Sequence, residues 1–453
     1  MMRFHDEGEA VTYIFKSMRK LRGQERGLDE RTRDVAPTRR LLAARNLLGT
    51  PREYAVVTGS KGKGSTTVIT SKLLQHLGHR VGTITSPHLI SWRERIRVNG
   101  RAIPEADFLR ILDDLAPDID AIEETLSEHT YFSPQGIFLA VALQWFDEQH
   151  VQAAVLEVGR GGRFDDIAVV PNKLALFTPI MLEHAEYMGP TLERIAWHKA
   201  GIIKAYGYAY SLPQSPEVMR VIQAEADALG AEFNWIAERD MAEYLGENED
   251  GLQIQLGRYG ELTLSLMGRY QIPNATLAVI AAGNMHARLH GVPHGSAEYI
   301  TAIRAGLSDV RWPGRCQKLQ DNPTVFLDGA INYESAQLMV QSVESHLHAP
   351  VVSILCVPSD KDYDGVYRAL GTISQHVILT ETRRNPSLHW LDEADALQAA
   401  RKYHSDVQFH ARLEDAVEAG KHLAGTDGTL LIVGTQSIVA ETVGLWGMEF
   451  EVI

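Results

Sequence analysis

Short runs of apolar residues alternate with segments of helical periodicity over almost the whole chain. The runs at 54–57, 81–84, 152–158 and 174–180 show no polar alternation, which predicts buried strands of a parallel sheet with helices on both faces. Residues 65–77 carry apolar side chains at helical spacing, which predicts a helix directly after the first strand. The repeated order of strand, turn, helix and strand predicts an α/β fold.

The second half of the chain repeats this pattern after an interruption. Two alternating runs at 252–256 and 262–266 flank a Gly-rich turn and predict a β-hairpin. The segment Arg311-Trp-Pro-Gly-Arg315 suits a connection between domains, and a surface turn is equally compatible with its composition. We predict an N-terminal α/β domain over residues 1–308 and a smaller C-terminal α/β domain over residues 309–453. The predicted strands of the smaller domain are 324–327, 351–355, 376–379, 407–410 and 430–433.

Composition narrows the class of protein. The 453 residues include 58 acidic and 44 basic side chains, a net charge of −14, which argues against a broad basic face for nucleic acid. The longest nearly apolar stretch, residues 136–146, is too short to span a membrane, and the charged N-terminus does not resemble a signal peptide. We expect a soluble cytoplasmic protein without nucleic-acid or membrane partners. The two cysteines, Cys316 and Cys356, are interpreted as core residues.

The strongest local signal is the segment GSKGKGST, between the first predicted strand and the first predicted helix. Glycines allow backbone N–H groups to converge on an anion at a helix N-terminus, and a lysine can reach the β- and γ-phosphates. Glycine follows the second lysine where the usual P-loop has Ser or Thr, so a Gly-rich turn with exposed lysines is the alternative. The strand–loop–helix context favours phosphate. The predicted phosphate-binding residues are Gly59, Ser60, Lys61, Gly62, Lys63, Gly64, Ser65 and Thr66.

From this loop onward the sequence resembles the folylpolyglutamate synthase and dihydrofolate synthase family, relatives of the Mur ligases, whose loop reads GTNGKGST. The next block, TSPHLISWRERIRVNG at 85–100, is similar to the family's TSPHL…ERI.VNG. Six further blocks match in the same order: LEVGRGGRFDD at 156–166, LEHAEYMGPTLERIAWHKAGIIK at 182–204, GRYQIPNATLA at 268–278, WPGR at 312–315, LDGAINYESA at 327–336 and SDKDYDG at 359–365.

The resemblance implies a fold and an activity. It implies a Mur-ligase-like protein with a P-loop parallel-sheet ATPase domain, a smaller Rossmann-like C-terminal domain, and ATP between them. Such enzymes phosphorylate a carboxylate with ATP, and the amine of an amino acid then attacks the acyl phosphate. The implied cofactors are ATP and Mg²⁺, the implied partners are a carboxylic acid and an amino acid or other amine, and the implied state is a monomer.

The resemblance also implies metal ligands. Ser86 and Glu157 match the family's first magnesium site, and Glu157 ends an apolar strand at the sheet edge where α/β proteins bind ligands. His184 matches the histidine that approaches a second magnesium, although a lone histidine is more often a hydrogen-bonded loop or core residue. Lys199 matches a lysine that many members carbamylate, and the carbamate would hold that second ion. Its alternative is an ordinary lysine on a helix face.

Three more residues match the family's nucleotide contacts. Asn274 matches an asparagine near the base, whereas Arg315 and Asp328 match contacts of the C-terminal domain to phosphate and nucleotide. The planar fork of Arg315 suits a transferring γ-phosphate, with a salt-bridged linker arginine as the alternative. The predicted catalytic residues are Lys63, His184, Lys199, Arg315 and Asp328.

Several positions depart from the family pattern. The family's DGAHN is DGAIN here, so Ile331 replaces the histidine that lies where the incoming glutamate binds. Isoleucine cannot donate a hydrogen bond or carry charge, which predicts poor use of glutamate. The other departures are TFFE to TYFS at 130–133, DATN to DDIA at 165–168, EKAGI to HKAGI at 198–202, the DH pair to Glu183-His184, and histidine to Tyr270.

Three readings follow from these matches and departures. The first, which the departures favour, is an ATP-dependent amide ligase that joins a carboxylic acid to an amino acid or other amine, with an altered substrate. The second is a genuine folylpolyglutamate or dihydrofolate synthase. The third is a nucleotide-binding regulatory subunit without ligase activity.

Overall fold

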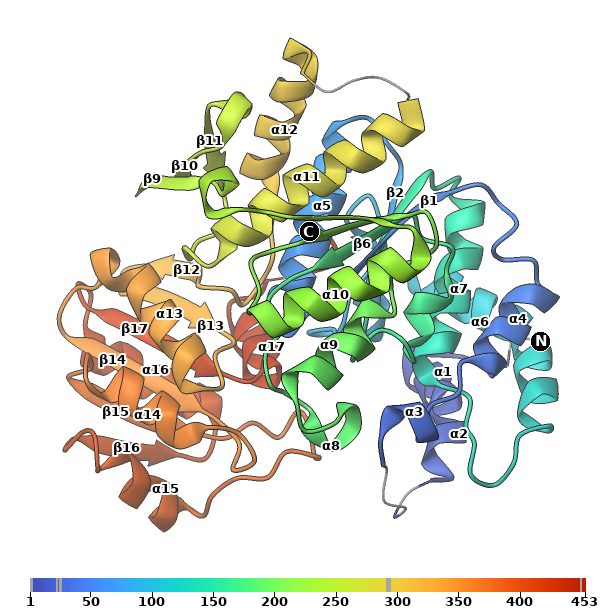
Figure 1. Ribbon diagram of the computed structural model, residues 1–453. Coiled ribbons are helices and arrows are strands. Elements are labelled where there is room, and N and C mark those ends of the chain that lie inside the picture. The colour runs from blue at the N-terminus through green and yellow to red at the C-terminus, as the bar shows by residue number, and fades with distance from the viewer. Residues whose placement is uncertain (1–2, 22, 24–26, 291–294, 449) are drawn as a thin grey trace.

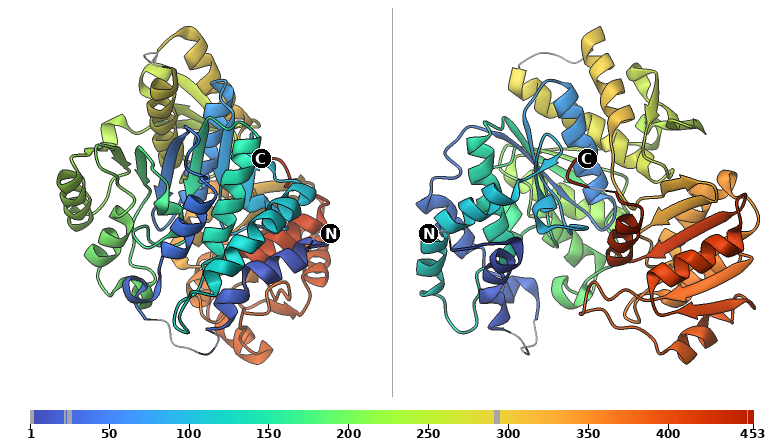
Figure 2. Two further views of the ribbon diagram at one scale, coloured as in Figure 1. Left: turned by 90° about the vertical axis from the view of Figure 1, so that its right-hand side faces the viewer. Right: turned by 180° about the vertical axis from the view of Figure 1, so that it is seen from behind.

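The computed structural model describes residues 3–21, 23, 27–290, 295–448 and 450–453. Its described strands form an eight-stranded, a three-stranded and a six-stranded sheet. Figure 1 shows the blue-to-green elements around the large sheet and the orange-to-red elements gathered on one side, around the six-stranded sheet. The right-hand view of Figure 2 shows the same division from behind. The predicted α/β class is confirmed.

The large sheet has the order β4-β3-β2-β5-β1-β6-β7-β8. The strands from β2 to β8 in this order are parallel, whereas β3 and β4 are antiparallel additions at one edge. The bounds are β1 (Glu53–Thr58), β2 (Val81–Ile84), β3 (Ile96–Val98), β4 (Arg101–Ala102), β5 (Ala153–Glu157), β6 (Leu174–Phe177), β7 (Tyr208–Ser211) and β8 (Glu232–Trp235). The four predicted strands are confirmed, but β6 ends three residues early because residues 178–180 turn toward the phosphate-binding loop. There the Pro179 carbonyl accepts a hydrogen bond from the Ser60 N–H at 2.7 Å.

Each face of this sheet carries its own core. Successive residues of β1 point to opposite faces, so Val56 packs in one core and Val57 in the other. The Val57 face is covered by α5 (Lys63–His76), α11 (Gln271–His290), α12 (Ala297–Asp309) and the small antiparallel sheet of β9 (Glu243–Asn248), β10 (Gly251–Gln255) and β11 (Glu261–Leu264). The predicted hairpin is confirmed as β10–β11. The Val56 face is covered by α1 (Glu7–Ile14), α4 (Ala36–Ala44), α6 (Glu105–Glu123), α7 (Pro134–Glu148), α9 (Leu192–Ala200) and α10 (Pro216–Leu229).

Short helices complete the N-terminal half. They are α2 (Lys16–Arg19), α3 (Asp29–Thr32), α8 (Ala185–Met188) and the 3₁₀ turns η1 (Trp92–Arg95), η2 (Asp166–Val169), η3 (Glu238–Asp240) and η4 (Gly257–Tyr259). None of the described helices is both long enough and apolar enough to cross a bilayer.

The six-stranded sheet has the order β12-β13-β17-β14-β15-β16, parallel except for β12. Its strands are β12 (Gln317–Asp321), β13 (Thr324–Asp328), β14 (Val351–Cys356), β15 (His376–Thr380), β16 (Val407–His410) and β17 (Thr429–Gly434). One face packs against α13 (Tyr333–Val343), α14 (Tyr363–Gly371) and α15 (Glu393–Ala400), with the turn η5 (Glu344–His346), and the other against α16 (Leu413–Ala424) and α17 (Gln436–Leu445). All five predicted strands are confirmed, and both cysteines are buried core residues.

The predicted domain boundary between residues 308 and 309 lies at the end of α12, before β12 begins the six-stranded sheet. We keep this division, 1–308 and 309–453, as a proposal. We refer below to the N-terminal unit and the C-terminal unit in this sense.

Candidate active site

The predicted phosphate-binding loop connects β1 to α5. Gly59 and Gly62 have positive φ angles of 145° and 84°. A Cβ atom on Gly59 would stand 1.9 Å from Oγ1 of Thr178, and one on Gly62 would stand 2.4 Å from Oδ1 of Asn274. Both positions therefore exclude a side chain by space as well as by backbone conformation. Gly62 is the N-cap of α5, so the unpaired N–H groups of the first helical turn begin at the loop.

Lysine side chains concentrate positive charge at this loop. Nζ of Lys63 donates a hydrogen bond to the Gly59 carbonyl at 3.0 Å, which holds the side chain over the loop. Burial lowers the pKa of Lys61; the Glu183 carboxylate opposes this shift, and the cations Lys63 and Arg315 add to it. Three cations in one place suit the binding of a polyphosphate.

A buried carboxylate lies beside the loop. Glu157 ends β5 with 4% of its surface exposed, and its Oε2 accepts a hydrogen bond from the Ser86 N–H at 2.9 Å. Burial raises the pKa of Glu157 to about 6, against the opposing charge of Lys63. Among the described residues, no group of three or more His, Cys, Asp or Glu side chains could hold a metal ion. A magnesium ion at Glu157 and Ser86 would therefore take its remaining ligands from phosphate and water, as magnesium commonly does.

The C-terminal unit supplies the opposite wall of the site. Asp328 ends β13, and its Oδ2 accepts hydrogen bonds from the Cys316 N–H at 2.7 Å and from the Tyr270 hydroxyl at 3.1 Å. Burial raises the pKa of Asp328, whereas Arg315 opposes the rise. Nη1 of Arg315 donates to the Gly314 carbonyl at 2.9 Å, so the guanidinium lies on the segment that joins α12 to β12.

Asn274 contacts the loop from α11. Its Nδ2 donates to Oε1 of Gln271 at 2.9 Å and to the Tyr270 carbonyl at 3.2 Å, and its Oδ1 lies 3.5 Å from Oγ1 of Thr66. These bonds fix the side chain at the position where a Cβ on Gly62 would collide with it.

Lys199 and His184 lie behind the loop. Lys199 is on α9 with 1% of its surface exposed, and its Nζ donates to the Gly59 carbonyl at 2.8 Å and to Oε1 of Glu183 at 3.1 Å. Burial lowers the pKa of Lys199 to about 8, and repulsion from Lys63 adds to this shift. His184 precedes α8 with a φ angle of 52°, and burial lowers its pKa as well.

A cavity of about 660 Å³ brings most of the predicted residues together. Gly59, Thr66, His184 and Lys199 do not line it; Thr66 lies beside Asn274, and the other three lie at or behind the loop. The predicted residues that line it are Ser60, Lys61, Gly62, Lys63, Gly64, Ser65, Ser86, Glu157, Asn274, Arg315 and Asp328.

Sequence reasoning did not assign many of the residues that line this cavity, among them Tyr270, Trp312, Gln436 and Phe450. Tyr270 bonds Asp328, Trp312 lies 3.0 Å from the position of a Cβ on Gly64, and Phe450 lines the wall. With its amide oxygen facing Arg315, Gln436 accepts hydrogen bonds from Nη2 and Nη1 at 2.7 and 2.8 Å. Trp312 stands inside a matched sequence block and could have been singled out there, whereas the sequence marks Tyr270 only as a departure from the family pattern. Gln436 and Phe450 carry no sequence signal.

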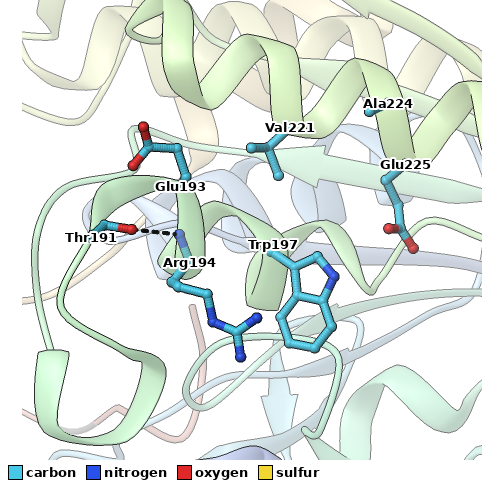
Figure 3. A pocket seen from close by; sticks show the side chains of 7 residues that line it. All are labelled: Thr191, Glu193, Arg194, Trp197, Val221, Ala224 and Glu225. Atoms are coloured by element: carbon cyan, nitrogen blue, oxygen red, sulfur yellow. Dashed lines mark hydrogen bonds between the residues drawn. The ribbon is translucent and has the colours of Figure 1, made fainter.

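A second pocket, of about 520 Å³, lies at the surface between α9 and α10 (Figure 3). The guanidinium groups of Arg163 and Arg194 lie over the Trp197 ring in this pocket, each 4.4 Å from the ring centre. Arg163 also pairs with Glu225 at 2.6 Å. None of the predicted site residues lines this pocket, so the candidate active site is the cavity at the phosphate-binding loop.

Comparisons with known proteins show the family to which the chain belongs. Residues 57–282 match the Mur ligase middle domain, and residues 314–436 match the glutamate ligase domain of Mur ligases. The dihydrofolate synthase/folylpolyglutamate synthase of Bacillus subtilis is 30% identical over 391 residues, 85% of this chain and 88% of that protein. The chain belongs to this family. The Mycobacterium tuberculosis member is 32% identical over 428 residues, 87% of this chain and 85% of that protein.

Solved structures agree with the family's fold. The Mycobacterium tuberculosis folylpolyglutamate synthase complexed with ADP aligns with a TM-score of 0.82 and 26% identity, over 97% of this chain and 99% of that chain. A bifunctional family member from Yersinia pestis, complexed with AMPPNP and a manganese ion, aligns with a TM-score of 0.78 over 99% of this chain. At 23% identity that second likeness shows the fold alone. The predicted Mur-ligase-like fold and the predicted ligase class are confirmed.

These comparisons also bear on the three readings. The relatives support a genuine folylpolyglutamate or dihydrofolate synthase better than a ligase with an altered substrate, because no comparison shows such an alteration. The reading as a subunit without activity does not fit a chain that belongs to a family of ligases.

Proposed function

We propose that the protein is a folylpolyglutamate synthase/dihydrofolate synthase, an ATP-dependent ligase that joins a folate-type carboxylic acid to glutamate. The observation that carries this proposal is the meeting of the phosphate-binding loop, Glu157 and Arg315 in one cavity of a chain from this family. Because the reaction consumes ATP, we propose a cytoplasmic location. We also propose a monomer, as the family resemblance implies.

The proposed reaction has two steps. A carboxylate oxygen of the acid attacks the γ-phosphorus of ATP, and the bond to the bridging oxygen breaks as ADP leaves. The amine nitrogen then attacks the carbonyl carbon of the acyl phosphate, the carbon–oxygen bond breaks, and inorganic phosphate leaves as the nitrogen loses its proton. The loop N–H groups and Lys63 would hold the phosphates, Arg315 would balance charge on the transferring phosphoryl group, and Asn274 and Asp328 would contact the nucleotide.

Glu157 and Ser86 would hold a magnesium ion, which supplies further positive charge to the phosphates when bound. The donors fit this ion, because one buried carboxylate and one hydroxyl are oxygen ligands that leave room for phosphate and water. The raised pKa of Glu157 fits as well, since burial disfavours its charge and a bound divalent cation would offset that cost.

We further propose that Lys199 is carbamylated and holds a second ion together with His184, as the family resemblance implies. A lysine pKa of about 8 supports this, because the neutral amine is the form that reacts with carbon dioxide. Enzyme depleted of bicarbonate should lose activity and regain it when bicarbonate is restored. Activity that does not respond to bicarbonate would speak against the modification.

The test of the function measures ADP release with ATP, magnesium, glutamate and either dihydropteroate or a reduced folate. We expect ADP only when the acid and glutamate are both present, and a product heavier than the acid by one glutamate residue. Lys63→Ala should abolish this release. The matched control is Lys72→Ala on the same helix, whose lysine forms a surface pair with Asp309 at 3.2 Å. Absence of acid-dependent and glutamate-dependent ADP release from the natural protein would overturn the proposal.

One observation favours the second candidate, a ligase of this family with a different amine. Ile331 lines the cavity beside Asp328, and the family resemblance puts a histidine at this position. An apolar side chain there removes a hydrogen-bond donor to an anionic amino acid. A panel of amino acids with the acid held fixed distinguishes the two candidates, because the second predicts a higher kcat/KM for an amine other than glutamate.

A further inference from the structure

The last described residues of the chain return from the C-terminal unit to the N-terminal unit. After α17, residues 450–453, the terminal segment, pair with the edge strand β4 of the large sheet. The Ala102 N–H donates to the Glu451 carbonyl at 2.7 Å, and the Ile453 N–H donates to the Gly100 carbonyl at 3.1 Å. The right-hand view of Figure 2 shows the dark-red end of the chain, marked C, among the blue elements of the N-terminal unit. The Ile453 side chain is buried in the N-terminal core.

A buried arginine fixes this segment. Arg97 on β3 has 2% of its surface exposed and donates hydrogen bonds to the carbonyls of Phe450 at 2.6 Å, Glu451 at 3.0 Å and Gly100 at 3.0 Å. A charged group buried at this depth is costly unless its hydrogen bonds are made. Arg97 therefore determines where the backbone of Phe450 lies. Arg93 adds an ion pair to the Glu451 side chain at 3.2 Å.

The side chain of Phe450 lines the same cavity as the phosphate-binding loop. Phe450 is 7% exposed and belongs to the core of the C-terminal unit, against which Leu89 also packs. Two of the charged residues that line the cavity, Arg97 and Glu94, are engaged with backbone. Arg97 serves the terminal segment, and Glu94 accepts hydrogen bonds from the N–H groups of residues 89, 90 and 91 at 2.9 to 3.0 Å. Phe450 and Leu89 therefore add apolar surface to the lining, next to these bonded charges and to the polar side chains of Ser86 and His88.

We propose that Phe450 is a specificity-determining residue that packs against the carbon skeleton of a carboxylic-acid substrate, and that Arg97 is a positioning residue acting through the backbone of the terminal segment. The proposal rests on the proposed function only in taking both organic substrates, the acid and the amino acid, as carboxylic acids. The phosphates of ATP belong to the charged part of the cavity around Lys63, so Phe450 should not affect ATP binding.

The test compares Phe450→Ala with the natural protein by measuring KM for the acid, the amino acid and ATP separately. We expect a rise of about tenfold or more in the KM of one organic substrate, because an apolar pocket loses roughly that factor per missing group, and an unchanged KM for ATP. The substrate whose KM rises is the one that Phe450 contacts. The matched control is Val452→Ala, in the same segment but 48% exposed and absent from the cavity lining, which should leave all three values unchanged.

Several results would overturn the proposal. Unchanged KM values in folded Phe450→Ala, or equal rises for all three substrates, would assign Phe450 a purely structural role. If the alanine variant does not fold, Phe450→Leu, which keeps most of the core volume, takes its place. We then expect a rise of less than tenfold in the KM of one organic substrate, and unchanged KM values would contradict the proposal. Arg97→Lys, which cannot reach three carbonyls, should raise the same KM as Phe450→Ala. If the natural protein does not join folate to glutamate, calorimetric binding of each acid to the same variants still tests Phe450.

Discussion

Replacement of Glu157 by glutamine should make the protein more stable near neutral pH while it impairs catalysis. Burial raises the pKa of Glu157 from its ordinary value of 4.5 to about 6. Between these values the folded state binds more protons than the unfolded state. The stability from this group is therefore present below about pH 4.5 and is lost as the pH rises through about 6. A shift of about 1.5 pKa units corresponds to about 2 kcal/mol at neutral pH.

Glutamine has nearly the same volume, can still accept the Ser86 N–H bond, and does not titrate. We therefore compare the unfolding free energies of Glu157→Gln and the natural protein at each pH. Relative to the natural protein, the variant should be about 2 kcal/mol more stable at about pH 7.5 than it is at about pH 4. Because only this pH-dependent change is used, constant effects of the substitution cancel. Turnover of ATP should fall in the same variant, since the ligand charge proposed for magnesium is gone.

Urea unfolding of both proteins at the two pH values measures the first quantity, and ADP release measures the second. The control is Glu148→Gln on α7, which replaces a partly exposed carboxylate that pairs with Arg110 at 2.6 Å. We expect this substitution to change the free energy of unfolding by less than about 1 kcal/mol at either pH and to leave turnover normal. If Glu157→Gln loses stability at neutral pH relative to acidic pH, the reasoning about its buried charge is wrong. Full turnover in the variant would refute its assignment as a ligand.

Three further predictions concern the same site. Lys63→Ala should abolish ligation but keep the thermal midpoint of the natural protein, because Lys63 is the first residue of α5 and its side chain extends over the loop rather than into a core; near-normal turnover would remove the phosphate-loop assignment. In protein depleted of bicarbonate, where Lys199 is a free amine, stability should rise with pH between about 8 and 10.5, since the folded lysine has the lower pKa; urea unfolding of Lys199→Met should lack this rise, and an equal rise in the variant would refute the reasoning. Ile331→His should raise kcat/KM for glutamate about 10-fold or more by restoring one charge-assisted hydrogen bond; unchanged kinetics would assign glutamate binding elsewhere.

The local part of the site follows from the sequence because its geometry depends on neighbouring residues. The loop from Gly59 to Lys63 is continuous with β1 and α5, so its glycines and its helix N-terminus are visible in the order of residues. Glu157 could be placed because it ends a buried run, and the carboxyl ends of parallel strands share one edge of a sheet. Buried strands were found for the same reason, as continuous apolar runs.

The edges of the large sheet were missed for the opposite reason. Strand β8 is largely exposed, with 54% of the Trp235 surface accessible, and β4 has only two residues. Such strands lack the apolar run that predicts a buried strand. They form because the neighbouring strand offers unpaired backbone groups, which is a property of the assembled sheet.

Contacts between distant parts of the chain were also beyond sequence reasoning. Lys199 bonds the carbonyl of Gly59 across 140 residues, and Arg97 bonds that of Phe450 across 353. No spacing predicts either bond, because each depends on how whole elements pack. The resemblance could mark Lys199 as important, but only the folded chain shows that its amine supports the phosphate-binding loop from behind.

Departures from the family pattern differ in their physical consequences. At residues 130–133 the family's glutamate is replaced by Ser133, and at 165–168 the family's alanine is replaced by Asp166. In the folded chain Ser133 hydrogen-bonds the Asp166 side chain, and Oδ1 of Asp166 accepts a bond from Thr38 at 2.6 Å. A carboxylate lost at one position is thus regained at its neighbour, with Arg33 at 3.5 Å as its counter-ion. The charge of this region is retained.

Tyr270 is compensated in the same way, because its hydroxyl donates to Asp328 as a histidine N–H could. Ile331 is not compensated, since its side chain has no polar atom and its N–H is bonded only to Oγ of Ser335 at 3.3 Å. Of these departures, Ile331 alone changes the hydrogen-bonding chemistry of the cavity, and it lies on the wall of the C-terminal unit rather than on the phosphate-binding loop. A difference from the family should therefore appear in the choice of amine before it appears in the use of ATP or of the acid.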